Sequence, residues 1–522
     1  MKRFTAALLA GFMTLFLFVG CSYGTASEKP SDNVDQSKEL IFAGSRDQAP
    51  GEKDSVYCTI NLGVWQPLVT QDQNGAPAPS LALTWTPNEE CTQWVFQLRE
   101  NVTFSNGTPF DADIVKANFE RYAKGPFPSS FYGFNIETTY PGLEEVVAVD
   151  QYTVQLNFST AYPMLPYAMS NFGSAMFEPS CFAEDGNFNG FAIGTGPYII
   201  TENVLGEYCT LVRNDNYYGE LPTIENMKFR VIPDANTRYS ALVSGEVHAL
   251  CDIGAITPSL AAELEKDDNF VVSVGKSGIV HYFHTNGNKW PWNDVRMREG
   301  LSLILNREEI NNEFYNGYSI PATGFLSYAS SFYNADCTLD YDLERGKALI
   351  DEVLEGQRVS ADFLLSEGDM NRYPHLEQAE YMQAMFAEVG IDVNILPAAW
   401  GTTRERLTAG DFDFCLKIQG LPSADPYSLF NGFMHSKGST NHTYGLGYNN
   451  PEVDAMIEAV RTETDIEKRK EVYDALQVQS TVDFPTIPIL FTRDVVACSA
   501  DVGGYVSAPY GIVGYTRLFW TK

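Results

Sequence analysis

The chain has 522 residues, too many for a single hydrophobic core, so two or three lobes are expected. Hydrophobic residues make up 44% of the sequence and aromatic residues 13%, a composition that is typical of an ordered globular protein rather than a disordered one. The formal net charge of −32 at pH 7 argues against a nucleic-acid partner, because so acidic a chain has no excess of basic residues to neutralise phosphates.

The N-terminus has the pattern of an export signal. Two basic residues precede an apolar run over residues 4–20, and the sequence FVGC places a small residue directly before Cys21. This pattern resembles a lipoprotein signal, in which residues 1–20 are removed and the new N-terminal cysteine is lipidated. Residues 21–38 then form a polar tether, and the protein is extracytoplasmic and anchored to the cell membrane. An ordinary signal peptide or a short transmembrane anchor is the alternative.

The cysteine pattern indicates no metal cluster. Nine cysteines are present, and eight remain when the lipidation site is set aside. Their spacings are wide and include no CxxC pair, which argues against a zinc site. Export would permit disulfides, but the spacing selects no pairing among the eight.

The hydrophobic pattern of the first half predicts strands and helices in alternation. Strands are expected over residues 41–47, 64–70, 94–100 and 153–159, where apolar and polar residues alternate or an apolar run is bounded by turns. An imperfect apolar face predicts a helix over residues 111–122.

The second half shows clearer periodicity. Apolar residues recur at helical spacing over residues 294–306 and 376–390, and Gly390 is placed to end the second helix. Residues 391–395 then alternate as a strand. The pattern as a whole predicts α/β lobes with a mixed sheet and shows no internal repeat.

Two further helix starts are marked by capping residues. Asn450 followed by Pro451 fits an N-cap with proline at the first helical position. Thr464 and Glu467 fit a capping box for the next helix.

Residues 64–122 contain short motifs in a fixed order: Pro-Leu-Val, Pro-x-Leu-Ala-x-x-Trp, Phe-x-Leu-Arg and Phe-x-Asn-Gly-x-Pro-Phe. They closely resemble the signature of extracellular solute-binding proteins of family 5, the peptide and nickel class of capture subunits of ABC importers. The resemblance continues in order through residues 194–198, 214–250, 293–310 and 448–460, and so covers nearly all of the mature chain.

The resemblance implies a periplasmic-binding-protein-like α/β fold with two lobes, a hinge and a ligand between the lobes. The first lobe is expected over residues 39–278, with an inserted subdomain over about 71–193, and the second lobe over residues 279–490. Residues 491–522 then return to the first lobe. Such proteins close around their ligand by hinge motion.

The resemblance also implies a nonenzymatic receptor for a small-molecule solute, which works as a monomer with an ABC permease and its ATPase. It implies no resident cofactor, since a metal, if present, is transported cargo. The sequence contains no GxSxG, HExxH, Walker-type or GxGxxG motif, which argues against the distant alternative of a cell-surface hydrolase. A lipoprotein that signals or adheres is a third alternative.

The stretch GLPSADPYSLF at residues 420–430 bears on the cargo. By resemblance it faces the cleft, and many peptide-binding relatives carry an extra aspartate three positions before the Asp-Pro to hold the ligand's ammonium group. Here that position is Pro422, so the usual peptide anchor is missing. Asp425 is shared by both subclasses and fits a turn or N-cap better than a ligand contact, although it stays a candidate together with Gln419.

Nickel-type relatives look more similar in this region, because they carry a downstream histidine that ligates the metal of a chelate. His435 and His442 are the candidates here, since neutral imidazole is a good nickel ligand, although both also fit a solvent-exposed loop. Cys58 falls where those relatives have a pocket methionine, and Trp400 follows a predicted strand; each is a candidate ligand contact or a core residue.

One departure weakens the nickel prediction. Nickel-type relatives hold the chelator's carboxylates with arginines from the inserted subdomain, and the matching segments at residues 124–133 and 170–180 contain none. Phe131 and Tyr132 could still line the cavity. The sequence therefore places capture of nickel or another metal chelate slightly above capture of a dipeptide or oligopeptide.

Overall fold

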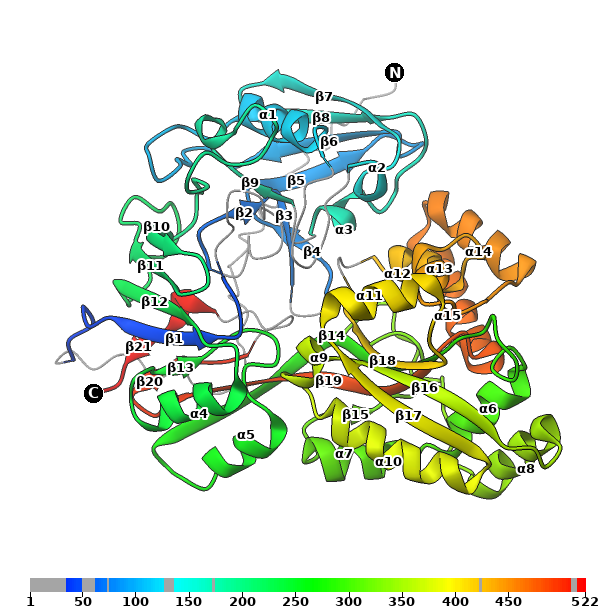
Figure 1. Ribbon diagram of the computed structural model, residues 1–522. Helices are drawn as coiled ribbons and strands as arrows, with labels where there is room; N and C mark the ends of the chain where they lie inside the picture. The colour runs from blue at the N-terminus through cyan, green and yellow to red at the C-terminus, as the bar shows by residue number, and fades with distance from the viewer. Residues whose placement is uncertain are drawn as a thin grey trace, which may run out of the picture.

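The structure of the protein, a computed structural model, describes residues 34–48, 62–72, 75–125, 136–170, 174–421, 425–507 and 514–522. The fold is mixed α/β and is built on an eleven-stranded sheet (Figure 1). Across the sheet the strands are β10 (Tyr198–Val204), β11 (Tyr208–Arg213), β12 (Asn226–Val231), β1 (Leu40–Gly44), β13 (Ala249–Leu250), β19 (Ile487–Ser499), β14 (Phe270–Thr285), β18 (Phe414–Gln419), β16 (Val359–Ser366) and β17 (Ile391–Ala398), with β15 (Ile320–Pro321) beside β19.

Two long antiparallel strands, β14 and β19, join the first-lobe end of this sheet to the second-lobe end (Figure 1). β19 pairs with β13 in the first lobe, and β14 pairs with β18 in the second. The register between β14 and β19 shifts between Lys276 and Val280, so the ladder is irregular where the two lobes meet. The lobe boundaries predicted after residues 278 and 490 fall inside these two strands.

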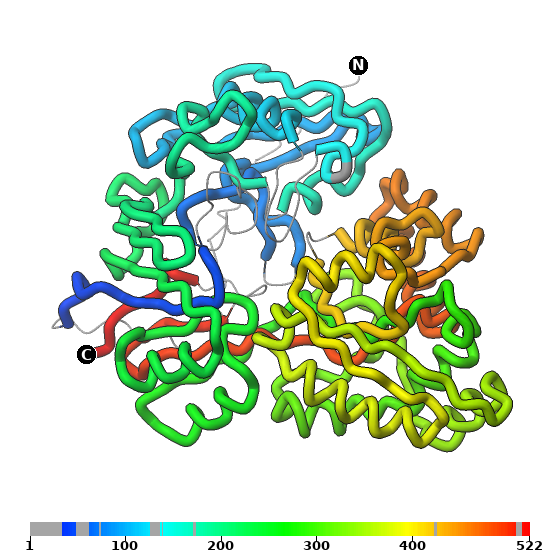
Figure 2. Tube along the Cα trace, in the orientation of Figure 1, coloured from blue at the N-terminus to red at the C-terminus, as the bar shows by residue number. Residues whose placement is uncertain are grey.

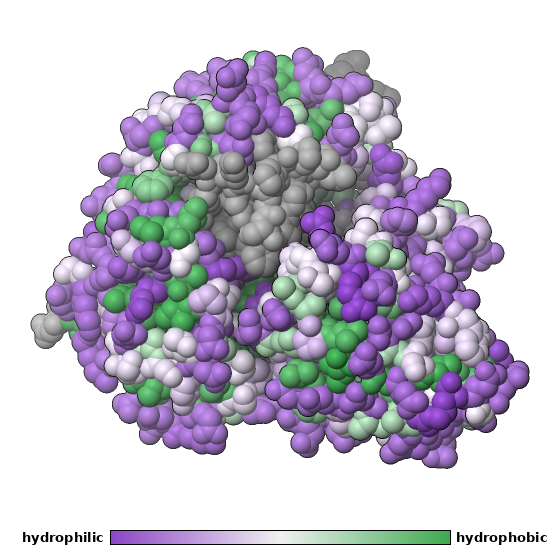
Figure 3. Space-filling view, in the orientation of Figure 1, coloured by the Kyte–Doolittle hydropathy of each residue, from purple (hydrophilic) through white to green (hydrophobic). Residues whose placement is uncertain are grey.

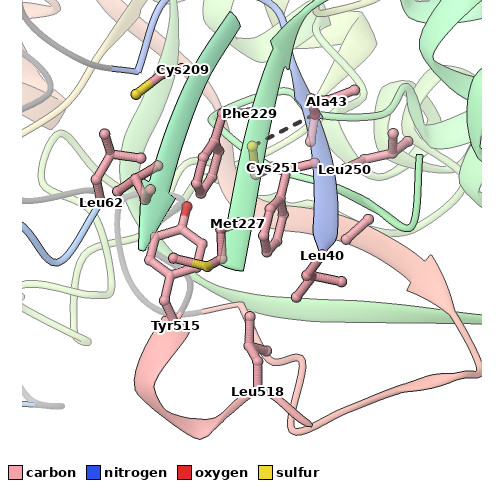
Figure 4. Packing of buried hydrophobic residues seen from close by; sticks show 14 of the residues in the cluster. Leu40, Ala43, Leu62, Cys209, Met227, Phe229, Leu250, Cys251, Tyr515 and Leu518 are labelled. Atoms are coloured by element: carbon pink, nitrogen blue, oxygen red, sulfur yellow. Dashed lines mark hydrogen bonds between the residues drawn. The ribbon is translucent and has the colours of Figure 1, made fainter. Parts of the chain in front are cut away.

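The first-lobe core forms where β1 and β12 pair in parallel. The rings of Phe42 and Phe229 stack with centroids 4.6 Å apart. Tyr515 meets Phe229 edge-on, with ring centroids 5.4 Å apart (Figure 4). Cys251 lies beside them and its thiol donates to the carbonyl of Ala43 at 3.6 Å. Because Tyr515 comes from the end of the chain, the C-terminal residues complete the first-lobe core. Helices α4 (Ala235–Val243) and α5 (Pro258–Leu264) pack at this end of the sheet.

The inserted subdomain has its own antiparallel sheet and core. The sheet runs β5 (Ala82–Pro87), β6 (Gln93–Leu98), β8 (Thr153–Phe158), β7 (Leu143–Asp150), and helix α1 (Ala112–Tyr122) packs against it. In β6 the alternate residues Trp94, Phe96 and Leu98 are buried, which confirms the predicted alternation. Asp111 begins α1 as its N-cap, accepting a backbone N–H of the first turn.

Short elements complete this half of the molecule. They are α2 (Ile136–Thr139), α3 (Leu165–Met169), and the strand pairs β2 (Gln66–Pro67) with β9 (Ala175–Met176), β3 (Val69–Gln71) with β4 (Pro77–Pro79), and β20 (Val502–Gly503) with β21 (Phe519–Trp520). The strand predicted over residues 64–70 is therefore two short strands, β2 and β3, because the chain bends between them to enter the inserted subdomain.

The chain leaves the first lobe and returns to it through a tight contact between two backbone segments. The N–H of Gly196 donates to the carbonyl of Val64 at 2.9 Å. A Cβ on Gly194 would lie 2.0 Å from that carbonyl oxygen, and one on Gly196 would lie 2.1 Å from the carbonyl oxygen of Gly63. The GTGPY sequence thus needs glycine at both positions, because only bare backbone fits between the two segments.

The second-lobe sheet is covered on both faces. One face packs against α6 (Val295–Ile304), α7 (Arg307–Tyr315), α8 (Leu343–Leu354) and α10 (His375–Glu388), and the other packs against α11 (Trp400–Ala409), α12 (Tyr427–Met434), α14 (Pro451–Thr462) and α15 (Ile466–Asp483). Phe414 and Leu416 of β18 point to the first set and Cys415 to the second. The remaining helices are α9 (Glu367–Met370) and α13 (Ser439–Thr443).

Most predicted helix ends are confirmed, and one is wrong. Asn450 caps α14 with Pro451 at the first position, and Gly390 follows α10 with φ +84°. The capping box predicted for Thr464 and Glu467 does not form, because Asp465 is the N-cap of α15 and its carboxylate accepts the N–H groups of two first-turn residues. A carboxylate one residue later thus takes the place of the threonine hydroxyl.

The face of the molecule seen in Figure 3 is mostly hydrophilic over the first lobe, the inserted subdomain and the second lobe, as expected of so acidic a chain. The seven cysteines within the described ranges are buried free thiols. No helix in the described part of the chain combines the length and apolar character needed to cross a membrane.

Candidate functional site

The carboxyl ends of the two sets of parallel strands face each other. Strands β12, β1 and β13 are parallel in the first lobe, and β17, β16 and β18 are parallel in the second. β14 passes from the first lobe to the second; β13 runs in its direction because both are antiparallel to β19, whereas β18 runs against it. Both sets therefore point inward, toward the region between the lobes. Figure 2 shows the first lobe, the inserted subdomain and the second lobe as three parts of the trace arranged around that region. Ligands of open α/β sheets bind outside such strand ends.

The first-lobe ends carry a charged pair. Arg46, two residues after β1, donates from Nη2 to Oδ1 of Asp252, two residues after β13, at 2.5 Å. The hydroxyl of Ser45 donates to the other carboxylate oxygen at 3.1 Å. Asp252 itself is buried and has φ +87°, an uncommon conformation for a residue other than glycine. The side chains that follow β1 and β13 are thus fixed against each other.

The second-lobe ends carry a buried cluster around one carboxylate. Asp369, in α9 after β16, accepts from Arg372 Nη2 at 2.8 Å and from Lys417 Nζ at 2.9 Å. Burial alone would raise the pKa of Asp369, but Lys417 and Arg372 outweigh it and bring the pKa down to about 2. The Lys417 ammonium also lies 4.5 Å from the ring centroid of Trp400. The result is an ionised carboxylate shared between two cations.

The predicted contacts Trp400 and Gln419 lie at these strand ends. Trp400 is the first residue of α11, just after β17, and 45% of its surface is exposed. Gln419 is the last residue of β18 and donates from its side chain to the carbonyl of Gly420 at 2.9 Å. An exposed aromatic ring and an amide at the inward edge of the sheet are available to a ligand, and their role in binding stays a prediction.

Asp425 follows β18 and belongs to a buried polar network. Its Oδ1 accepts from Tyr473 Oη at 2.8 Å, from the N–H of Tyr427 at 3.1 Å and from Arg469 Nη2 at 3.5 Å. Arg469 and Tyr473 are almost fully buried, and Arg469 also donates to Tyr473 Oη at 2.9 Å. The carboxylate therefore supports the turn into α12, as the sequence favours.

A hollow of about 400 Å³ lies where the inserted subdomain meets the second lobe. Its lining comes from the loop after β8, from one face of α12 and its C-terminal cap, and from the last turns of α14: Thr160, Tyr427, Asn431, His435, Glu458, Arg461 and Thr462. The hollow brings an imidazole, a guanidinium, a carboxylate and several uncharged polar groups together.

His435 is buried in the wall of this hollow, whereas His442 is exposed. Nδ1 of His435 accepts the N–H of Lys437 at 3.0 Å, so a neutral ring carries its proton on Nε2, which lies 3.4 Å from Oε1 of Glu458. His442 sits on α13, which packs against α11. The two imidazoles thus differ in setting, and no group of three or more His, Cys, Asp or Glu that could hold a metal occurs among the described residues.

The histidines of β14, His281 and His284, point to opposite faces, because residues three positions apart on a strand lie on opposite sides of the sheet. His281 Nδ1 is 3.2 Å from Nε2 of His375, while His284 Nδ1 is 2.6 Å from the hydroxyl of Thr486. Burial lowers the pKa of His375 to about 4 and that of His284 to about 3, so both rings are neutral at pH 7.

Four predicted site residues, Cys21, Cys58, Phe131 and Tyr132, lie outside the described residues.

The chain matches known proteins over most of its length. The family of bacterial extracellular solute-binding proteins, family 5, matches residues 76–441. The chain belongs to this family. It is 26% identical over 465 residues to the nickel-binding periplasmic protein of Escherichia coli K12, covering 85% of this chain and 87% of that protein. It is 27% identical over 466 residues to the probable D,D-dipeptide-binding periplasmic protein DdpA of the same strain, covering 86% and 87%.

Solved structures show that this family 5 protein shares the fold of its relatives. The crystal structure of NikA from Brucella suis in complex with Fe(III)-EDTA matches with a TM-score of 0.82 at 23% identity, covering 93% of this chain and 100% of that one. The predicted family and fold class are therefore confirmed, and the protein is a solute-binding receptor of family 5.

The sequence analysis missed most charged residues of this candidate site. Arg46, Asp252 and Asp369 follow strands, and Lys417 lies near the end of one, but the hydrophobic pattern reveals these strands only in part. The rule that ligands gather at carboxyl ends of parallel strands would have marked Arg46, at the end of the strand predicted over residues 41–47. Arg461 gave no such signal, because an arginine near the end of an exposed helix is ordinary.

Proposed function

We propose that this protein is the lipid-anchored receptor of an ABC importer, and that it captures nickel or another metal chelate between its lobes for a membrane permease and its ATPase. The observation that carries the proposal is the hollow at the junction of the inserted subdomain and the second lobe, which brings His435 and Arg461 together. An imidazole suits the metal of a chelate, and a guanidinium suits its carboxylates.

Arg461 supplies what the inserted subdomain lacks. The segments that carry arginines in nickel-type relatives have none here, but α14 places a guanidinium in the hollow from the opposite side. Arg461 is exposed and makes no ion pair with another described residue, so its charge is available to an anionic ligand. A chelate brings most of its own metal ligands and needs few from the protein.

Coordination through Nε2 of His435 requires the other neutral tautomer. The proton moves from Nε2 to Nδ1, the hydrogen bond from the N–H of Lys437 to Nδ1 is lost, and Glu458, whose side chain is largely exposed, turns away from Nε2. Oδ1 of Asp454, 3.9 Å from Nδ1, is then the carboxylate that orients the protonated nitrogen. His442, Trp400, Gln419, Cys58, Phe131 and Tyr132 are proposed as further contacts to the solute.

Capture of a dipeptide or oligopeptide is the second candidate. The facing strand ends carry charges of both signs, Arg46 with Asp252 and Arg372 with Asp369, which suits a zwitterion. Against it, position 422 is proline and Asp425 is already bonded to Arg469 and Tyr473. The probable D,D-dipeptide-binding relative supports this candidate, as the nickel-binding relative supports the first.

The membrane attachment is proposed from the N-terminal signal. Lipidation of Cys21 after removal of residues 1–20 would hold the monomeric protein at the outer surface of the cell membrane. A Cys21→Ala variant is expected in the medium or the soluble fraction, and its retention in the membrane fraction would argue for a different anchor.

The test of the cargo is calorimetric titration of the soluble chain with nickel plus L-histidine. His435→Ala and Arg461→Ala are each expected to weaken binding at least about tenfold, because each removes a direct contact to the chelate. His248→Asn, which keeps an acceptor for the N–H of Ile41 far from the hollow, is the control and should bind normally. Unchanged affinity in both test variants would overturn the proposed site.

A further inference from the structure

Asp425 is tied to the α12 wall of the hollow. Its carboxylate accepts the N–H of Tyr427, the first residue of α12, at 3.1 Å. Tyr427, Asn431 and His435 recur every four residues, and all three line the hollow. The position of this polar face therefore depends on how the first turn of α12 is held.

The same carboxylate is tied to the α14 wall through Arg469. Nη2 of Arg469 donates to Asp425 at 3.5 Å, while Nη1 donates to the carbonyl of Val460 and, at 3.2 Å, to that of Glu463. These carbonyls flank Arg461, which α14 presents to the hollow. Arg469 thus caps the C-terminal end of α14 with one part of its guanidinium and contacts Asp425 with another.

The far end of the two helices is joined independently. The N–H of Ser436, just after α12, donates to Oδ1 of Asp454 in α14 at 2.8 Å, and its hydroxyl donates to Oδ2 at 2.5 Å. The walls of the hollow are thus connected at both ends, by Ser436 with Asp454 at one and by Asp425 with Arg469 at the other. Tyr473, stacked on Phe430 with centroids 5.5 Å apart, packs the second connection into the core.

We infer that Asp425 is a positioning residue that sets the spacing of the two helical walls of the hollow through Arg469, rather than a contact to the solute. The consequence for binding rests on the proposed function; the effect on the helices does not. Loss of the carboxylate leaves a buried guanidinium without its countercharge and frees the first turn of α12. Both walls then loosen at the end that carries Tyr427 and Arg461, while the Ser436 end stays closed.

Hydrogen exchange of the ligand-free protein tests the inference. In Asp425→Asn, amide exchange over residues 427–431 and 458–463 is expected to speed up at least about tenfold. Leu301→Ala, in the core on the opposite face of the second-lobe sheet, is the control, with denaturant used to match the two variants in unfolding free energy. A merely structural role would give both variants the same exchange pattern, and that result would overturn the inference.

A second variant keeps the test valid if Asp425→Asn fails to fold. Arg469→Lys retains the charge but cannot donate to Asp425 and to both α14 carbonyls at once. It is expected to speed exchange in the same two segments, and unchanged exchange there would also overturn the inference.

Titration with nickel plus L-histidine then separates positioning from contact. Asp425→Asn and Arg469→Lys should each weaken binding about tenfold in parallel with their faster exchange. Weaker binding by Asp425→Asn without faster exchange would mean that the carboxylate touches the solute, and would overturn the inference. If the unaltered protein does not bind nickel with histidine, the proposed cargo fails, while the exchange result still decides the role of Asp425.

Discussion

Asp369 is a buried carboxylate of the candidate site with two cationic partners. It is buried between Arg372 and Lys417, and each cation depends on it for compensation, since Lys417 is also buried. A buried carboxylate that is removed leaves two cations without a partner, which costs more than the pair itself contributes. The stability of the second lobe therefore depends on the ion pairs that Asp369 makes with Arg372 and Lys417 at the strand ends.

Asp369→Asn is expected to lower the free energy of unfolding by about 3 kcal/mol at pH 7, because Lys417 and Arg372 lose their countercharge. The folded pKa of about 2 lies below the ordinary value of 3.8, so the carboxylate stabilises the fold above about pH 4 and loses this effect as the pH falls toward 2. The difference in unfolding free energy between Asp369→Asn and the unaltered protein should therefore become smaller as the pH falls from about 4 to about 2, as measured by urea unfolding.

Asp351→Asn is the control for this measurement, because Asp351 is an exposed carboxylate on α8. It should change the unfolding free energy by no more than about 0.5 kcal/mol. A gap between Asp369→Asn and the unaltered protein that stays constant down to about pH 2 would contradict the account of the cluster.

Residue roles were predictable from the sequence only where the partner lies nearby in the chain. Asn450 begins α14 and Gly390 ends α10 through local interactions, and both roles are predicted correctly from the sequence. Asp425 was assigned to a turn, but its bond to Arg469, 44 residues away, depends on how α15 packs. The capping role predicted for Thr464 is wrong because the neighbouring Asp465 is a stronger N-cap for the same helix.

Among the elements, the contact between the segments that enter and leave the inserted subdomain has no room for a side chain at Gly194. Gly194→Ala should lower the unfolding free energy by about 2 kcal/mol or more, because the added methyl would overlap the carbonyl of Val64. Gly401→Ala is the control: nothing lies near that Cβ position in α11, and alanine should be neutral or stabilising. Equal thermal shifts for the two variants would contradict the packing described for this contact.

The segment around α3 docks the inserted subdomain on the second lobe. Met164 is buried in a cluster whose other buried members come from the second lobe and from the crossing strand β19, and Tyr167 lies beside Phe332 with ring centroids 6.0 Å apart. This apolar contact forms between the two bodies, so it should favour the arrangement in which they meet.

Met164→Ser is expected to shift the ligand-free protein toward a more open arrangement and to raise its radius of gyration in small-angle X-ray scattering. Met456→Ser removes a methionine from the same cluster but within the second lobe, so the radius should not change. An equal radius for the two variants would show that Met164 does not hold the bodies together.

Strands and helices with a clear period were predicted well, whereas their interruptions were not. The alternation in β6 and the apolar stripe of α6 depend on residues two to four positions apart. The split of the strand predicted over residues 64–70 comes from pairing with β9 and β4, which follow later in the chain. Such pairing partners leave no trace in the local pattern.

At the scale of the whole molecule, ordered motifs gave the family and fold, but the hydrophobic pattern gave no domain boundary. The reason lies in β14 and β19, which pass from one lobe to the other as continuous strands. A chain that crosses twice within regular structure has no polar linker to mark the crossing. The hollow could not be predicted from the sequence either, because its lining joins Thr160 of the inserted subdomain to residues far along the chain.

Thermal unfolding of the soluble chain against a ligand panel tests the proposed cargo most directly. The panel holds nickel alone, nickel with L-histidine, and mixed dipeptides to pentapeptides. A ligand of the native state at 100 times its dissociation constant adds about 2.7 kcal/mol. The proposal predicts a clear rise in Tm with nickel plus histidine and none with peptides. A rise with peptides alone would contradict metal-chelate capture and identify the protein as a peptide receptor.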